Sequence, residues 1–598
     1  MSTKEKVVRI GGASGFWGDS TVAAPQLVHG AEIDYLVFDY LAETTMAILA
    51  SARNKKPELG YATDFVDIAM RSVLPEVMKR GIKVVANAGG INPHGCATAL
   101  AKLADDLGVI VKIAVVEGDD VSVQIPALRS AEQKDMFTGE ALPERILSAN
   151  VYLGALPIAQ ALAEGADIVV TGRCVDSATT LGPLIHEFGW SADNYDQLAG
   201  GSLAGHIIEC GCQGTGGLHT DWELVERWAE IGYPVIECQR NGHFVVTKPQ
   251  GTGGLISVAA VAEQMLYEIG DPTAYMLPDV VCDFSHVSIE QETVDTVVVK
   301  GARGLPPTDC YKVSATYVDG YRCAGTMVII GIDAVAKAKR TGAAIIERTR
   351  AIFRQRGLAD YTETYVEVIG GETLYGPHSR AVHAREVMMR VVVNHRQKEA
   401  LEIFAREIMP SGTSWAPGTT APAGGRPSAS PLIKQFSFML PKRMVSVSVS
   451  IGGNSTPVAV PLEGGYRPKA AMPCLEASPA AAIGKTVQVP LVKLAYARSG
   501  DKGNISNIGV IARRPEYLPI LLHQLTPQVV KAYFAHLVHG EVERYLVPGI
   551  QAFNFLLFDA LDGGGQASMR MDPLGKGMAQ MLLDLPINVP EELAGHLS

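Results

Sequence analysis

Four side chains in the first 210 residues are of the types that transfer protons in enzymes. Asp39 and Glu43 follow a short apolar run, and His206 and Glu209 lie three residues apart further along the chain. Carboxyl and imidazole groups act as general acids and bases when burial or a neighbouring charge brings their pKa near the working pH. A simple charge at a helix N-terminus is the alternative for Glu43. The predicted catalytic residues are Asp39, Glu43, His206 and Glu209.

Two glycine-rich segments, 11–19 and 87–93, follow short strands and could bind a ligand through their backbone. Glycine lets the backbone approach a phosphate or acyl group, and a following helix supplies N–H donors. The spacing departs from the dinucleotide fingerprint G-x-G-x-x-G, and no Tyr is followed four residues later by the Lys that short-chain dehydrogenases need. Ordinary tight turns remain the alternative. The predicted substrate-binding residues here are Gly12, Ser14, Gly15, Asn87, Gly89, Gly90 and Asn92.

Cations in two other polar segments could neutralise an anionic substrate. The guanidinium of Arg173 suits carboxylate or phosphate, and Asp176 either shares this site or only pairs with Arg173. Thr215 lies in a second glycine-rich turn, 213–217. Arg498 and Lys502 flank a polar turn near the C-terminus, for which a solvated hairpin is the alternative. Arg173, Asp176, Thr215, Arg498 and Lys502 complete the predicted substrate-binding set.

The signals for metals, nucleotides and nucleophiles are weak. His206, Glu209 and Cys210 are all of zinc-binding types, but the chain has no HExxH or CxxC motif to accompany them. It also has neither a G-x-S-x-G elbow nor a Walker A loop. We therefore predict no metal and no required cofactor, with coenzyme A present only as part of a substrate.

Alternating strands and helices are expected to position these residues. Apolar runs at 7–10, 35–38, 84–86 and 168–170 each end in a polar loop, and 109–115 is a further strand. Helical spacing occupies 64–79 and 96–107. Such alternation predicts a parallel, doubly wound α/β sheet over residues 1–290. Right-handed crossovers place all strand carboxyl ends on one edge, where ligands of such sheets bind.

The pattern changes to α+β from about residue 291. Strands are expected at 294–299, 310–318, 326–330, 365–369 and 387–393, with helices at 334–354 and 397–407. Residues 410–431 are rich in Pro and Gly and predict a long loop within a unit spanning 291–469. Residues 470–485 predict a linker. A C-terminal α+β domain, 486–598, is expected to contain strands at 487–497, 508–512, 553–557 and 567–571.

Composition narrows the class of protein. The 598 residues are 47% hydrophobic and carry a net charge of −11, and nine cysteines are scattered without a disulfide-like pattern. An acidic chain without a basic cluster is a poor nucleic-acid binder. With no signal peptide and no long apolar run, we expect a cytoplasmic protein without a membrane partner. A homo-oligomer is expected on the base rate for large metabolic enzymes.

Taken together, several segments resemble the acyclic terpene utilisation (AtuA) family. They are 10–19, 87–93, 171–176, 205–217 and 497–504. The resemblance implies a large AtuA domain to about residue 460 and a smaller ferredoxin-type domain. It also implies citronellol and geraniol catabolism through branched acyl-CoA intermediates.

We expect an enzyme that acts on a small-molecule acyl substrate, an acyl-CoA or related acid, by lyase or hydratase chemistry. A non-catalytic acyl-CoA-binding or pathway-assembly protein is the second hypothesis, and an NAD(P)-dependent dehydrogenase is the third.

Overall fold

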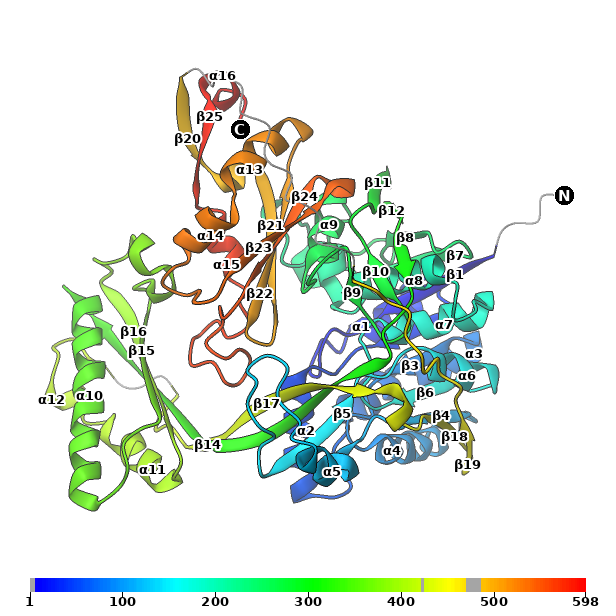
Figure 1. The fold of residues 1–598 in the computed structure, drawn as a ribbon, viewed down its shortest axis with the longest axis horizontal. Coiled ribbons are helices and arrows are strands. Elements are labelled where there is room, and N and C mark those ends of the chain that lie inside the picture. The colour runs from blue at the N-terminus through cyan, green and yellow to red at the C-terminus, as the bar shows by residue number, and fades with distance from the viewer. Residues whose placement is uncertain (1–5, 421–423, 469–484, 598) are drawn as a thin grey trace.

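A mixed eleven-stranded sheet forms the largest part of the molecule (Figure 1). The computed structural model describes residues 6–420, 424–468 and 485–597. Five neighbouring strands in the middle of the sheet are parallel. In sheet order they are β1 (Val7–Gly12), β2 (Tyr35–Phe38), β3 (Lys83–Ala86), β6 (Ile168–Thr171) and β4 (Ile113–Glu117).

The remaining six strands are antiparallel, so the predicted parallel doubly wound sheet is only partly present. Short hairpins join them in pairs, and a hairpin can connect only antiparallel neighbours. Beyond β1 lie β7 (Val235–Gln239), β8 (Phe244–Thr247), β12 (Thr296–Lys300) and β11 (Ser288–Thr293). Beyond β4 lie β18 (Ser448–Ile451) and β19 (Asn454–Pro457). The sheet therefore extends past residue 290 in sequence.

Helices cover both faces of the parallel strands, as the apolar strand sequences predicted. One apolar core contains residues of α1 (Ala23–Gly30), α2 (Glu43–Lys55), a π-helical turn (Phe65–Met70), α3 (Arg71–Arg80) and α4 (Pro93–Asp106). The other contains α5 (Ile125–Ser130), α6 (Leu156–Ala163), α7 (Ala178–Phe188), α8 (Tyr195–Ile208) and α9 (Val258–Leu266). A small sheet of β9 (Tyr275–Met276), β10 (Val281–Asp283) and β13 (Arg303–Leu305) lies beside them.

A single 21-residue strand, β14 (Cys310–Ile330), leads from this part of the molecule into a second sheet (Figure 1). Two strands were predicted here, and that prediction is wrong. Asp319-Gly320 is a typical turn pair, but it forms a bulge between Val318 and Tyr321, and Gly320 has a φ of +85°. A bulge takes up the extra residue and bends the strand without ending it.

The second sheet and its helices form one α+β unit. Its other strands are β5 (Ile146–Val151), β15 (Glu363–Ile369), β16 (Glu386–His395) and β17 (Ser430–Pro441). The helices are α10 (Ala334–Arg356) and α11 (Lys398–Glu407). The short helix α12 (Ser411–Ser414) occupies the start of the predicted loop 410–431, of which 421–423 lie outside the described residues.

The C-terminal unit has a four-stranded antiparallel sheet of β21 (Ala495–Lys502), β22 (Ile505–Ala512), β24 (Ala552–Leu557) and β23 (Val542–Val547). A pair, β20 (Thr486–Pro490) and β25 (Pro586–Pro590), lies apart from it. The helices are α13 (Leu518–Gln524), α14 (Pro527–Tyr533), α15 (Met578–Leu582) and α16 (Glu591–Ala594). The predicted linker lies outside the described residues except at Lys485.

Two strand predictions in this unit are wrong. The run 487–497 is broken by a 3-10 turn, Leu491–Lys493, that follows Pro490. Residues 567–571 form no strand, because their carbonyl groups bond to side chains instead of a neighbouring strand. Arg322 donates to the carbonyls of Ala567 and Ser568, and Arg390 to that of Met569.

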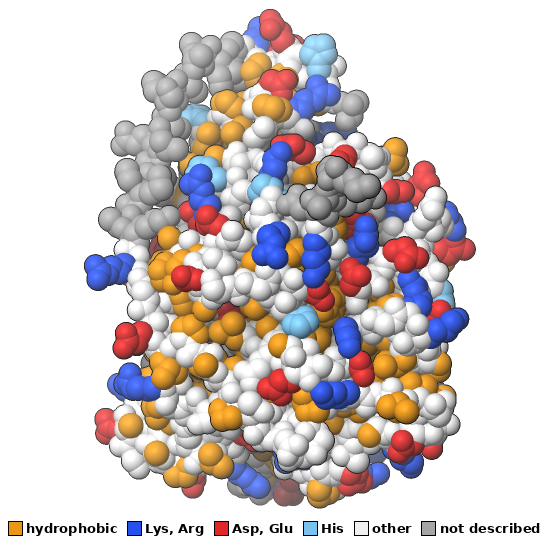
Figure 2. All heavy atoms as spheres, turned by 90° about the vertical axis from the view of Figure 1, so that its right-hand side faces the viewer, with side chains coloured by type: hydrophobic (Ala, Val, Ile, Leu, Met, Phe, Trp, Pro, Cys, Tyr) orange, Lys and Arg blue, Asp and Glu red, His pale blue; other side chains and the backbone are white. Residues whose placement is uncertain are grey.

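Two further observations concern membrane-spanning helices and surface charge. In the part of the chain that the structure describes, no helix is long and apolar enough to cross a membrane. On the face shown in Figure 2, basic and acidic side chains are interspersed.

Gly12, at the end of β1, and Gly15, after it, allow close packing against the end of α8. A Cβ on Gly12 would lie 2.7 Å from the carbonyl oxygen of Ile208, and one on Gly15 would lie 2.8 Å from the carbonyl carbon of Cys210. These are backbone contacts, so neither could be relieved by turning a side chain. The loop is therefore held against residues 208–210.

We expect Gly12→Ala to lower the free energy of unfolding by about 1–3 kcal/mol, because the added methyl group overpacks this contact. Calorimetric thermal midpoints would measure the loss. Gly270→Ala is the matched control, since a Cβ there meets nothing within 4 Å. Equal midpoints for the two variants would contradict this account of the loop.

Candidate functional site

Ten ionisable side chains interact around the carboxyl ends of the parallel strands. We call them the charged cluster. Its carboxyl groups are Asp39, Glu43, Asp176, Glu209, Glu268 and Asp501, and its cations are Arg173, Lys312, Lys502 and Lys576. They come from the ends of β2, β6, α8 and α9, from the starts of α2 and β14 and from the end of β21, with Lys576 just before α15. Six of the predicted site residues are thus brought together.

The charged cluster is only partly buried. Glu43 and Lys502 keep 33% and 41% of their side-chain surfaces exposed. Even so, burial by the surrounding protein is the largest influence on the pKa of each. Side chains that are packed within the protein and still reach solvent can contact a small ligand.

Asp39, directly after β2, is fixed by Asn87, directly after β3. The Asn87 amide nitrogen donates to Oδ1 of Asp39, and its oxygen accepts from the Tyr40 N–H at 2.7 Å. Asp39 is 8% exposed. Burial raises the pKa of Asp39 well above its ordinary value, and the neighbouring carboxylates of Asp176 and Glu209 raise it further. The protonated acid is therefore favoured here.

Glu43 has the opposite electrostatic environment. Its Oε1 accepts from the Tyr152 hydroxyl at 2.5 Å and lies 3.8 Å from Nζ of Lys312. Burial alone would raise its pKa, but Lys312, Arg173 and the Tyr152 hydroxyl together lower the pKa of Glu43 to about 2. Arg173 and Lys312 both lie over the Tyr152 ring, at 4.2 and 5.1 Å from its centroid. Glu43 is therefore ionised at neutral pH.

Asp119, which sequence reasoning missed, holds the loop that carries Arg173. Its Oδ2 accepts from the Arg173 N–H and from the Asn150 amide, both at 2.8 Å. Arg173 then directs its guanidinium to Asp176 at 2.7 Å. Burial raises the pKa of Asp119 to about 6. Asp119 follows β4 in a polar loop like the others, so its place at a strand end was the signal available.

His206 and Glu209 form a buried pair at the end of α8. Nδ1 of His206 lies 2.9 Å from Oε1 of Glu209, and His206 is 2% exposed. Burial lowers the pKa of His206 to about 4, so its imidazole is neutral. Burial and the Asp176 carboxylate raise the pKa of Glu209 well above its ordinary value. The protonated form of Glu209 is therefore favoured, and the neutral His206 fixes its orientation.

The C-terminal unit completes the charged cluster. Nζ of Lys502 lies 3.9 Å from Glu268, and Nζ of Lys576 lies 2.9 Å from it. Buried Asn507 positions Glu268 by accepting from its N–H at 2.9 Å. Burial raises the pKa of Glu268 to about 7, although Lys502 opposes this rise. Glu268, Lys312 and Lys576 were not predicted, because none lies in a recognisable motif, and Asp501 was not predicted although it lies in the segment 497–504.

The other predicted binding residues have partners within the protein. Ser14 donates to the Asp39 carbonyl at 3.0 Å, and Thr215 donates to the Gly232 carbonyl at 2.6 Å. Asn92 accepts from the Gly95 N–H at the start of α4. A Cβ on Gly89 would lie 2.4 Å from the Thr171 carbonyl oxygen, and Gly90 has a φ of +55°. These residues shape and support the loops around the charged cluster.

Arg498 lies outside the charged cluster, in a buried network between the N-terminal and C-terminal units. It donates to Gln213 at 2.8 Å and to the Gly217 carbonyl at 2.9 Å, and lies 3.3 Å from Glu263. Glu263 has no exposed surface and also lies 3.0 Å from His219. The guanidinium of Arg498 therefore joins the two units.

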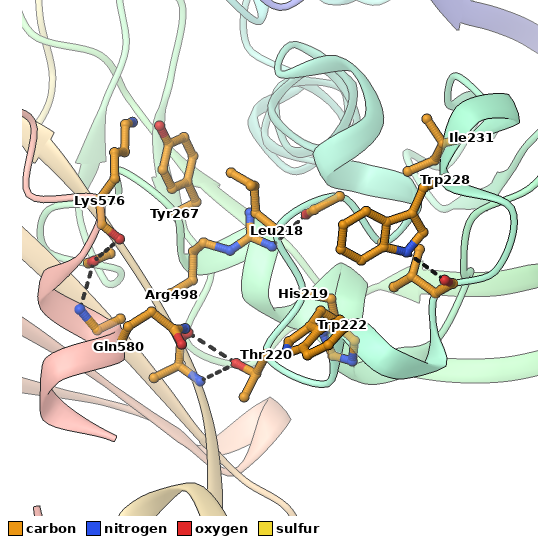
Figure 3. A pocket seen from close by; sticks show the side chains of 16 residues that line it. Leu218, His219, Thr220, Trp222, Trp228, Ile231, Tyr267, Arg498, Lys576 and Gln580 are labelled. Carbon is orange, nitrogen blue, oxygen red and sulfur yellow. Dashed lines mark hydrogen bonds between the residues drawn. The ribbon is translucent and has the colours of Figure 1, made fainter. Parts of the chain in front are cut away.

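A cavity of about 460 Å³ lies beside this network (Figure 3). Its walls are formed by residues 216–220, Trp222, Val225, Trp228, Ile231, Tyr267, 497–499, Lys576, Ala579 and Gln580. Lys576 belongs both to this cavity and to the charged cluster. The cavity and the charged cluster are therefore adjacent.

Two cysteines lie near this site, at the end of α8. Burial raises the pKa of Cys210 well above its ordinary value and that of Cys212 to about 12. Within residues 6–420, 424–468 and 485–597, no three His, Cys, Asp or Glu side chains are arranged to hold a metal ion.

Two related protein families together match nearly the whole chain. The family described as "Acyclic terpene utilisation family protein AtuA" matches residues 8–451. The family described as "AtuA ferredoxin-like domain" matches residues 489–588, which correspond to the C-terminal unit. No curated protein and no solved structure matches the chain.

We expect Asp119→Asn to change the pH dependence of stability. The pKa of Asp119 rises on folding from 3.8 to about 6, so its contribution is favourable at low pH and is lost as pH rises through 6. The neutral amide does not titrate. From pH 4 to pH 8 the variant should gain about 2 kcal/mol relative to the wild-type protein. Denaturant unfolding at several pH values would measure this, and a constant difference would contradict it.

Proposed function

Because the chain belongs to the acyclic terpene utilisation family AtuA, we propose that it catalyses a lyase or hydratase step on a branched acyl group derived from an acyclic terpene. The substrate is an acyl-CoA or the related acid. One observation supports the reaction class most strongly. The charged cluster contains carboxyl groups whose pKa values are moved in opposite directions, with Asp39 protonated and Glu43 ionised. Such pairs separate the roles of acid and base.

Asp39 is the proposed proton donor. Its Oδ1 accepts from the Asn87 amide and, at 3.4 Å, from the Leu41 N–H, so the proton is expected on Oδ2. Loss of water or cleavage of a carbon–carbon bond requires such a proton at the leaving oxygen or carbon. Glu209, protonated and oriented by His206, is the second donor in the charged cluster.

Glu43 and the cations have the complementary roles. An ionised carboxylate can remove a proton from a hydroxyl group or from the carbon next to a carbonyl. The enolate or oxyanion that results needs positive charge held in place before the reaction. Arg173 is fixed by Asp119 and Asp176, and Lys312 lies next to Glu43. These two cations are the proposed anion-stabilising groups.

Asp39→Asn should lower turnover at least about 100-fold, because the amide cannot donate a proton as an acid does. The purified full-length protein would be incubated with branched C10 acyl-CoA thioesters, and loss or gain of water or carbon would be followed by mass spectrometry. Glu32→Gln, which removes a 93% exposed carboxylate, is the control and should retain the wild-type rate.

Two outcomes would contradict the proposal. A wild-type rate in Asp39→Asn would remove Asp39 as the donor. Binding of the thioesters by the wild-type protein without any turnover would favour the non-catalytic acyl-CoA-binding hypothesis instead.

A further inference from the structure

The cavity beside the charged cluster has the size of a small-ligand site. Its volume of about 460 Å³ falls within the range of roughly 300–1,000 Å³ that such sites occupy. It lies between the N-terminal and C-terminal units. Figure 3 shows Lys576 and Tyr267 on one side, Trp228 and Ile231 on the other, and Leu218 between them.

One side of the cavity is apolar and unusually exposed. Leu218, Trp222 and Trp228 have 66%, 56% and 60% of their surfaces exposed. The two indole rings lie 5.9 Å apart at 78°, and Nε1 of Trp228 donates to the Val225 carbonyl at 2.7 Å. Large apolar side chains that are exposed and held in place often mark a binding site.

The opposite side leads to the charged cluster. Nζ of Lys576 lies 4.3 Å from the centroid of the Tyr267 ring and 2.9 Å from Oε1 of Glu268. A molecule in the cavity would therefore have its apolar part against the indoles and its polar end near Lys576. The next groups beyond that end are those of the charged cluster.

We infer that this cavity binds the hydrocarbon part of an aliphatic small molecule whose polar end lies at Lys576. The inference that an aliphatic chain binds here rests on the cavity walls alone. That the bound molecule is the substrate, with its reacting end in the charged cluster, rests on the proposed function.

The test titrates the purified full-length protein with 1-hexanol, 1-heptanol and 1-octanol in a calorimeter. Each alcohol should bind at one saturable site. Affinity should rise about four-fold for each added CH2 group, because that is the effect of moving one methylene from water into an apolar site. No saturable binding, or no dependence on chain length, would overturn the inference and leave the exposed indoles as a protein-contact surface.

Two leucine variants locate the site. Leu218→Gln puts a polar group in the cavity wall and should weaken 1-octanol binding about ten-fold. Leu224→Gln alters a leucine of the same segment that is 61% exposed and does not line the cavity, so it should bind like the wild-type protein. Equal affinities in both variants would place the alcohol elsewhere. No step of this test needs turnover, so failure of the proposed reaction and failure of this site give different results.

Discussion

Packing six carboxyl groups close together at one edge of the sheet is the constraint on which the rest of the structure depends. Carboxylates lose hydration there and repel one another, so the charged cluster is stable only if some stay protonated and others meet cations. The structure does both. Asp39 and Glu209 favour the protonated form, while Lys312 and Arg173 neutralise Glu43. The same distribution of protons and charges provides acids, a base and anion-stabilising groups in one place.

The cations come from distant parts of the sequence, so the folded arrangement of all three units matters. Arg173 follows a strand of the first sheet, Lys312 lies near the start of β14, and Lys502 belongs to the C-terminal unit. The position of Lys502 depends in turn on how that unit docks. The ion pair of Arg498 with Glu263 and the hydrogen bond of Asn507 to the Leu266 carbonyl hold the two units together. Residues without a chemical role thus influence the electrostatics of the charged cluster.

The sequence predicted the parts of the site that obey a topological rule. Asp39, Asn87 and Arg173 each follow an apolar parallel strand, and such strand ends meet at one edge of a sheet. Lys312 and Glu268 follow no such rule, because β14 and the residues after α9 reach the charged cluster only through tertiary packing. The same limit applies to the fold. Two separate strands were predicted at 310–318 and 326–330, but pairing with β16 and β17 makes them one strand that continues through Asp319-Gly320. The hairpins that flank the parallel strands also depend on long-range pairing, which a local pattern does not reveal.

The contacts among the three units form a closed circuit. β14 connects the first sheet to the second by covalent bonds, and Arg322 of the second sheet holds the carbonyls of residues 566–568 in the C-terminal unit. The C-terminal unit then returns to the first through Arg498 and Asn507. In such a circuit, a broken interface leaves its two surfaces tethered by the other two, at high effective concentration. Transient opening at one interface would therefore be followed by rapid reclosure, so that the cavity could admit a ligand without the units coming apart.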